Sequence, residues 1–315
     1  MSATQSGPAG ATLPAGGERL GVLLVALAAI CWSFGGAIAH YIEASDAWTV
    51  VFWRSIWAMV FLLGFMFWRD GISGTLTLFL RMGLPGLAVA VCFTTASISF
   101  IVALQFTTVA NVLLMQAGAP LIAALMAWAF FRERTSPATW AAIAAVIFGI
   151  GIMVSESITG AVSPIGDALA LTIAFCYAAA IVLTRRFSHV RMTPATCLAT
   201  VFAAIVAATQ TSAFIVSGAD MGWLVAFGAL NLGLGLALFA TGARLIPAAM
   251  AALLGTLEPV LGPVWVWLLH GETPSASTLV GGAIVFAALL VHIGVEFRRQ
   301  LRSSRVGTTG LPTPM

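Results

Sequence analysis

Ten long apolar segments follow one another along this sequence, separated by short polar connections. A helix needs about 20 mostly apolar residues to cross the hydrocarbon core of a bilayer. By that rule, spans are predicted at residues 20–40, 47–68, 83–104, 109–131, 138–155, 166–184, 194–217, 222–241, 247–269 and 277–295. Of the 315 residues, 60% are hydrophobic and only 8% are charged, whereas soluble domains carry roughly 25% charged residues. The sequence therefore predicts an all-α integral membrane protein with ten transmembrane helices.

The two ends of the chain lie outside these spans. Residues 1–19 are small, polar and rich in Pro and Gly, a composition that cannot bury a core and predicts a disordered cytoplasmic N-terminus. Residues 296–315 are predicted to form a cytoplasmic tail. No basic region opens the chain, and the first apolar segment starts only at Leu20, so we expect that segment to be the first span and not a cleaved signal peptide.

The arginines define an orientation. All fourteen basic residues are arginine, and cytoplasmic loops carry the excess of positive charge. A cytoplasmic N-terminus would place thirteen of the fourteen on the cytoplasmic side. They are Arg19, Arg69, Arg81, Arg132, Arg134, Arg185, Arg186, Arg191, Arg244, Arg298, Arg299, Arg302 and Arg305. Both termini are therefore predicted to be cytoplasmic, and the acidic Glu43, Asp46, Glu156, Asp167, Asp220 and Glu272 fall on the opposite side.

An internal repeat divides the chain into two halves. Shifted by 139 residues, LMQAGAPLIAALMAWAFFRERTS (114–136) aligns without gaps on LLGTLEPVLGPVWVWLLHGETPS (253–275). The aligned pairs include Leu114 with Leu253, Pro120 with Pro259, Trp128 with Trp267, and Glu133 with Glu272. Each half contains five spans, and because five is odd the second half starts from the other side of the membrane. Inverted repeats of this kind are typical of secondary transporters whose binding site lies at the midplane.

The sequence resembles the EamA family of the drug/metabolite transporter superfamily over residues 20–295. The resemblance rests on the two five-helix repeats (20–155 and 166–295), on FWRS at 52–55, and on the repeated proline-centred helix that ends in a glutamate. It implies an inner-membrane carrier of small solutes, in many members an exporter of amino acids or other metabolites. It also implies a central cavity between the halves, with the fifth and tenth helices at the periphery. The second half has no clear copy of FWRS.

Glu258 is an acidic residue in the middle of the ninth span. It lies about eleven residues into that span, roughly 16 Å of helical rise, and a charged carboxylate there costs at least about 2.5 kcal/mol. It must face water or a partner, or take up a proton, so a proton-coupled role is chemically available. Pro259 and Pro263 also leave backbone carbonyls without helical donors. The aligned residue of the first half is Ala119, so the acid belongs to one half only. A structural kink with the acid paired to another helix is the alternative interpretation.

Arg54 is the only arginine inside a span. It lies about seven residues, roughly 10 Å, from the outer end of the second helix, and guanidinium stays charged at any relevant pH. Four roles are open: pairing with Glu258, binding the carboxylate of a substrate, reaching outward to the interface, or taking part in gating.

Further candidates for substrate contacts are aromatic or uncharged polar. Ordinary packing or interhelical hydrogen bonding would explain each of them as well. They are Trp32 and Tyr177, which occupy matching places in the first and sixth spans, Asn111 and Gln116 in the fourth span, and Trp265 on the same face as Glu258.

Several other functions find no support. A nucleotide-binding GxxxxGK[ST] motif is absent, no cofactor is indicated, and the four cysteines have no metal-ligand spacing. An intramembrane protease would need its serine at depth in a helix, whereas Ser73 of GISG is expected in a cytoplasmic loop. A channel would need a ring of charges or carbonyls. The prediction is a secondary carrier of small organic solutes, with a lipid flippase on the same scaffold as the alternative; oligomeric state stays open.

Overall fold

Helices account for all regular structure in the described part of the chain. The computed structural model describes residues 15–43, 46–132, 135–158, 163–187, 190–246 and 248–308. The helices are α1 (Ala15–Ser33), α2 (Gly35–His40), α3 (Ala47–Arg81), α4 (Gly83–Ala103), α5 (Val109–Gln116), α6 (Ala119–Phe131), α7 (Pro137–Ile158), α8 (Pro164–Arg186), α9 (Thr193–Gln210), α10 (Gly218–Val225), the π-helix η1 (Ala226–Leu234), α11 (Gly235–Gly242), α12 (Ala248–Gly255), α13 (Leu257–His270) and α14 (Ala276–Thr308). Within those ranges, ten helical segments are long and apolar enough to cross a membrane, which confirms the predicted number of spans.

Some predictions fall outside the described residues. Positions 1–14 of the N-terminal segment, the residues Glu133 and Arg134, and the last seven residues of the tail are among them. In the described part of the termini, helix extends further than expected. α1 already begins at Ala15, and α14 continues to Thr308.

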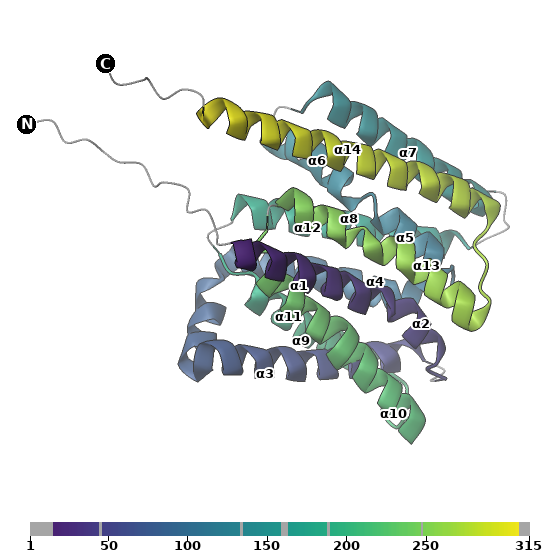
Figure 1. Cartoon of the computed structure of the whole chain (residues 1–315). Helices are drawn as coiled ribbons and strands as arrows, with labels where there is room; N and C mark the ends of the chain where they lie inside the picture. The colour runs from purple at the N-terminus through teal and green to yellow at the C-terminus, as the bar shows by residue number, and fades with distance from the viewer. Residues whose placement is uncertain are drawn as a thin grey trace, which may run out of the picture.

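The bundle has two ends, which we name after the first two helices (Figure 1). At the α1 end, α1 begins and α14 ends; at the α2 end, α2 ends and α3 begins. α7 and α14, the fifth and tenth spans, lie side by side at one edge of the bundle. The backbones of Gly149 and Gly281 approach so closely there that a Cβ on Gly149 would meet the carbonyl oxygen of Gly281 at 2.7 Å.

The two halves are packed into each other and do not form separate bundles. α3 and α4 of the first half pack against α9 of the second half, and α4 also packs along α8. α1 in turn packs along α11. Alanine and other small residues dominate the buried positions, which is how helices approach closely inside a bilayer. A site between the halves is therefore surrounded by helices from both.

Two spans differ in length from the prediction. The second continues past residue 68 to Arg81, through a kink at Gly71. The seventh ends at Gln210 and not at 217, because the chain beyond it turns to meet the start of α3. Asp46 caps α3 by accepting the Trp48 N–H (3.0 Å) and also accepts the Ser212 N–H (3.0 Å). Burial alone would raise the pKa of the Asp46 carboxyl, but these hydrogen bonds outweigh it and hold that pKa below its usual value.

Three spans are interrupted, two near their middles and the first close to its α2 end. The fourth is interrupted between α5 and α6, just before Pro120, and the ninth between α12 and α13, just before Pro259. The first is interrupted at Phe34. The fourth and ninth spans are broken at aligned prolines because proline removes the helical hydrogen-bond donor at the same place in each half. The internal repeat is therefore visible in the backbone as well as in the sequence.

Candidate functional site

Arg54 lies buried between helices and not at the membrane surface. Arg54 is only 7% exposed. Nη1 donates to Ser97 Oγ of α4 (2.9 Å), and the guanidinium carbon lies 4.5 Å from the centre of the Phe227 ring of η1. Nε is buried without a hydrogen-bond partner. The interpretation that Arg54 reaches outward is therefore wrong, and one of its donors is left for another acceptor.

Glu258 lies in the first turn of α13, directly after the break in the ninth span. The positive end of the helix dipole favours a carboxylate there. Its residue is only partly buried, and among the described residues it has neither a hydrogen bond nor an ion pair within 4.0 Å. The direct Glu258–Arg54 ion pair that the sequence suggested is thus not formed.

Arg54, Tyr177 and Glu258 nevertheless belong to one electrostatic group. The charge of Glu258 acts on the Arg54 guanidinium and on the Tyr177 hydroxyl, and Arg54 acts on both of the other groups. The three come from α3, α8 and α13, the second, sixth and ninth spans. Tyr177 and Glu258 keep accessible surface although they lie deep among helices. The structure thus brings the two main candidates and one aromatic candidate to a common region without direct contact between the charges.

Trp32 and Tyr177 do not face each other. Trp32 of α1 packs on Phe239 of α11, with ring centres 5.4 Å apart, and Tyr177 of α8 packs edge-on against Phe93 of α4 at 5.6 Å. α1 and α8 are matching spans, as are those that contain α4 and α11. The two aromatic pairs are therefore repeat-related, and each joins the first span of one half to the third span of the other half.

Trp265 and Gln116 lie near the helix breaks. Trp265 Nε1 donates to Ser33 Oγ (3.0 Å), and the indole stacks on Phe34 with ring centres 4.8 Å apart. It thereby connects the break in the first span to α13. Gln116 ends α5 at the break of the fourth span and is partly exposed, and its side-chain amide has no hydrogen bond within the described ranges.

Asn111 lies at the α2 end, away from the broken centres of the spans. Its Nδ2 donates to Asp167 Oδ1 of α8 (2.6 Å) and to Thr107 Oγ1 (2.9 Å). Asp167, which the sequence placed at the outer start of the sixth span, is only 3% exposed. Asn111 thus connects the fourth span to the sixth where both begin.

A cluster that the sequence did not predict closes the α2 end further. We call it the His40–Glu272 cluster: His40, His270, Glu272 and the backbone N–H of Val109. Glu272 accepts from His40 Nε2 (2.9 Å) with one oxygen and from the Val109 N–H (2.9 Å) with the other. The imidazoles of His40 and His270 stack at 4.8 Å. The repeat had singled out Glu272 only as a residue aligned with Glu133; in the structure it joins α2, α5 and the end of α13, and it accepts the N–H of the first residue of α5.

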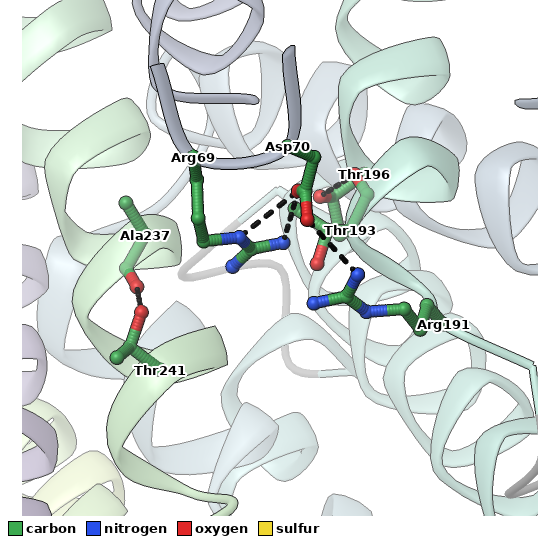
Figure 2. A network of polar contacts seen from close by, with 7 residues as sticks. All are labelled: Arg69, Asp70, Arg191, Thr193, Thr196, Ala237 and Thr241. Atoms are coloured by element: carbon green, nitrogen blue, oxygen red, sulfur yellow. Dashed lines mark hydrogen bonds and ion pairs between the residues drawn. The ribbon is translucent and has the colours of Figure 1, made fainter. Parts of the chain in front are cut away.

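A different network lies at the α1 end (Figure 2). Asp70 of α3 accepts from Arg69 Nε (3.0 Å) and from Arg191 Nη1 (3.1 Å), which precedes α9. The sequence had placed Arg69 and Arg191 on one side of the membrane, but it did not predict that they share a carboxylate. No group of three His, Cys, Asp or Glu side chains in the described part of the chain could hold a metal ion.

Comparisons with known proteins agree with this architecture. The profile of the EamA-like transporter family matches residues 19–155 and 164–294, one match per half. No curated protein is matched by the sequence. A solved crystal structure, described only as that of a protein, shares the fold with a TM-score of 0.61 at 18% identity, and the alignment covers 89% of this chain and 98% of that chain.

Proposed function

The chain belongs to the EamA-like transporter family, and from that premise we propose that it is a secondary carrier that exports amino acids or related small organic solutes across the cell inner membrane. The observation that carries this proposal is the electrostatic group of Arg54, Tyr177 and Glu258, because it draws on both halves of an inverted repeat. Sites between such halves are the ones that alternating access can open to either side.

An amino acid would fit the two separated charges of this group. The free Nε of Arg54 offers a donor to a carboxylate, and Glu258 offers an acceptor to an ammonium group. Tyr177 and Trp265 would border the apolar part of the solute, and Gln116 would contribute an amide at the neighbouring break. Trp32 would act through its packing on α11, and Asn111 from the α2 end.

Glu258 is also the proposed proton carrier. A carboxylate without a basic contact partner can exchange a solute ammonium for a proton, since either one neutralises it. Export would then be driven by the proton gradient, or by the solute gradient alone if Glu258 binds only solute.

Alternating access requires that each end can close. We propose that the α2 end faces outward and the α1 end faces the cytoplasm, so that the arginines and both termini are cytoplasmic. The His40–Glu272 cluster and the Asn111–Asp167 pair then hold the outer end closed. Export would require these contacts to open while the cytoplasmic end closes.

Reconstitution into proteoliposomes tests the proposal. A screen of amino acids and organic cations as competitors should find saturable uptake of a labelled amino acid, with stereoselective competition. Scrambling of labelled lipids without solute uptake would instead identify a lipid flippase, and non-saturating ion conductance a channel. Either outcome would contradict the carrier.

A further inference from the structure

The end of α3 departs from the direction of the spans. Gly71 has φ 71° and ψ 173°, a left-handed conformation that strains any residue with a side chain, and the helix resumes after it up to Arg81. In Figure 1 the ribbon turns at this point and crosses the ends of neighbouring helices at the α1 end. A second positive φ, at Gly83, returns the chain to the direction of α4. The segment 72–81 is therefore a short helix that lies at the α1 end of the bundle, out of line with the spans.

One side of this segment is apolar and exposed. Large apolar residues recur every four positions from the end of the second span to the start of the third. They are Trp68 (83% exposed), Ile72 (68%), Leu76 (59%), Leu80 (85%) and Leu84 (80%). Residues four apart lie on one side of a helix, so Ile72, Leu76 and Leu80 share one side of the segment, while Trp68 and Leu84 flank it beyond Gly71 and Gly83. The opposite side is packed: Thr75 is buried, and Leu78 and Phe79 contact a cluster that contains Leu62 and Met66. The segment is thus amphipathic, and its apolar side has no protein cover in the chain as described.

Basic groups accompany this apolar side. Arg81 ends the helix, is exposed, and makes no hydrogen bond or ion pair with the described residues. Arg69 and Arg191 share one carboxylate, Asp70, so one positive charge of that trio stays unbalanced. Basic groups beside an apolar helical face are the pattern of helices that lie in a membrane interface, where arginine attracts anionic headgroups.

We propose that residues 68–84 form an interfacial anchor, with the exposed stripe inserted among acyl chains and Arg81, Arg69 and Arg191 binding the phosphate of anionic phospholipids. The stripe is continuous with lipid-facing positions of the second and third spans, which places it at the edge of the hydrocarbon layer. Asp70 holds two of the arginines at that height (Figure 2). The anchor depends on the membrane-spanning fold and on neither the solute nor the direction of transport.

Spin labels on the full-length protein in phosphatidylglycerol-containing vesicles test the insertion. The four native cysteines are replaced by serine, and a single cysteine is introduced as Leu80→Cys, Leu76→Cys, Ser73→Cys or Thr77→Cys. Labels at 76 and 80 should collide with oxygen dissolved in the bilayer, and labels at 73 and 77 with a water-soluble nickel chelate. Equal nickel contact at all four sites would overturn the proposal, as would labels at 76 and 80 that neither probe reaches, the signature of a second protein surface.

Lipid binding is tested with native mass spectrometry of the detergent-solubilised protein. Phosphatidylglycerol and phosphatidylcholine compete for binding to the Arg81→Gln variant and, separately, to the Arg244→Gln variant. Arg244 is an exposed arginine at the same end of the bundle, so its replacement is the matched control. We expect Arg81→Gln to lower the preference for phosphatidylglycerol about fivefold, the factor that corresponds to about 1 kcal/mol per arginine. Arg244→Gln should leave the preference unchanged. Equal effects of the two changes, or none, would contradict a headgroup site at Arg81.

Discussion

The fourth and ninth spans share one backbone design but are held very differently. Each is broken just before an aligned proline, Pro120 or Pro259. In the fourth span 56% of the most apolar stretch is buried, whereas in the ninth only 22% is. The fourth carries Ala119 where the ninth carries Glu258. The break that both spans share is thus a property of the repeat. The acidic residue and the low fraction of buried residues are found only in the ninth of these two spans.

This contrast suggests which element moves. A span with few buried side chains loses little packing when it shifts, whereas a deeply buried one must carry its neighbours with it. The ninth span also bears Glu258 in its middle and leads directly to Glu272 at its end. We therefore infer that α12 and α13 move during the transport cycle, and that α5 and α6 stay in place as a fixed wall of the site.

The largest effect expected from the contrast concerns stability. Ala124→Pro copies into α6 the proline that α13 has at Pro263, since the two positions align in the repeat. It should lower the free energy of unfolding by about 3 kcal/mol, because it removes a helical hydrogen bond inside a packed wall. The reverse change, Pro263→Ala, should alter thermal stability little. Denaturation of both purified variants measures this, and equal losses would remove the distinction between a fixed and a mobile span.

The second effect concerns the charge that only the ninth span carries. Glu258→Gln should lower the initial rate of proton-driven transport at least about tenfold, or about 1.4 kcal/mol, because glutamine neither binds a proton nor balances an ammonium group. Gln116→Leu, at the break of the fourth span, is the control and should reduce the rate less. Unchanged rate and unchanged pH dependence in Glu258→Gln would exclude Glu258 from the mechanism.

A smaller effect is expected at Arg54. Arg54→Lys keeps the charge but loses the planar contact with Phe227 and the fork of donors. Affinity for carboxylate-bearing solutes should fall about threefold to tenfold, as for the loss of one ordinary hydrogen bond of about 1 kcal/mol, because lysine keeps the charge; the effect should be weaker on solutes that lack a carboxylate. Competition assays in proteoliposomes provide the comparison. A uniform loss for both classes would show that Arg54 is structural.

The smallest effect is expected where the ninth span ends. Glu272→Gln keeps an acceptor for the Val109 N–H but loses the charge that faces His40. Partly exposed ion pairs contribute only about 0–1 kcal/mol, so the closed outer end should be weakened a few-fold at most. Labelling of an introduced Ala37→Cys by an impermeant thiol reagent should become faster in a cysteine-free background. Slower labelling would count against the cluster as a closure.

Sequence reasoning reached the features that single residues determine. The number of spans followed from apolar runs, and the backbone carbonyl left without a donor at the break of the ninth span followed from Pro259, because proline acts on its own helix. Pro263, by contrast, lies inside the continuous helix α13. The position of Glu258 in mid-span required only counting. The inverted orientation of the halves followed from the odd number of spans in each.

Contacts between distant segments could not be predicted in this way. His40 and Glu272 meet only because the first and ninth spans end side by side, and no local pattern encodes that neighbourhood. Asp46 ends α9 seven residues early through Ser212, again a contact made by packing. Arg54 was recognised as important, but its bond to Ser97 and its separation from Glu258 depend on how the halves fit together.

A cross-link at the α2 end tests alternating access most directly. His40→Cys and His270→Cys, whose native rings stack at 4.8 Å, are combined in a protein without the four native cysteines and joined by a short, cleavable bifunctional thiol reagent. Solute flux in proteoliposomes should fall to background and return on cleavage, whereas a monofunctional reagent should leave most of it. Full flux through the cross-linked protein would contradict a carrier that opens this end in every cycle.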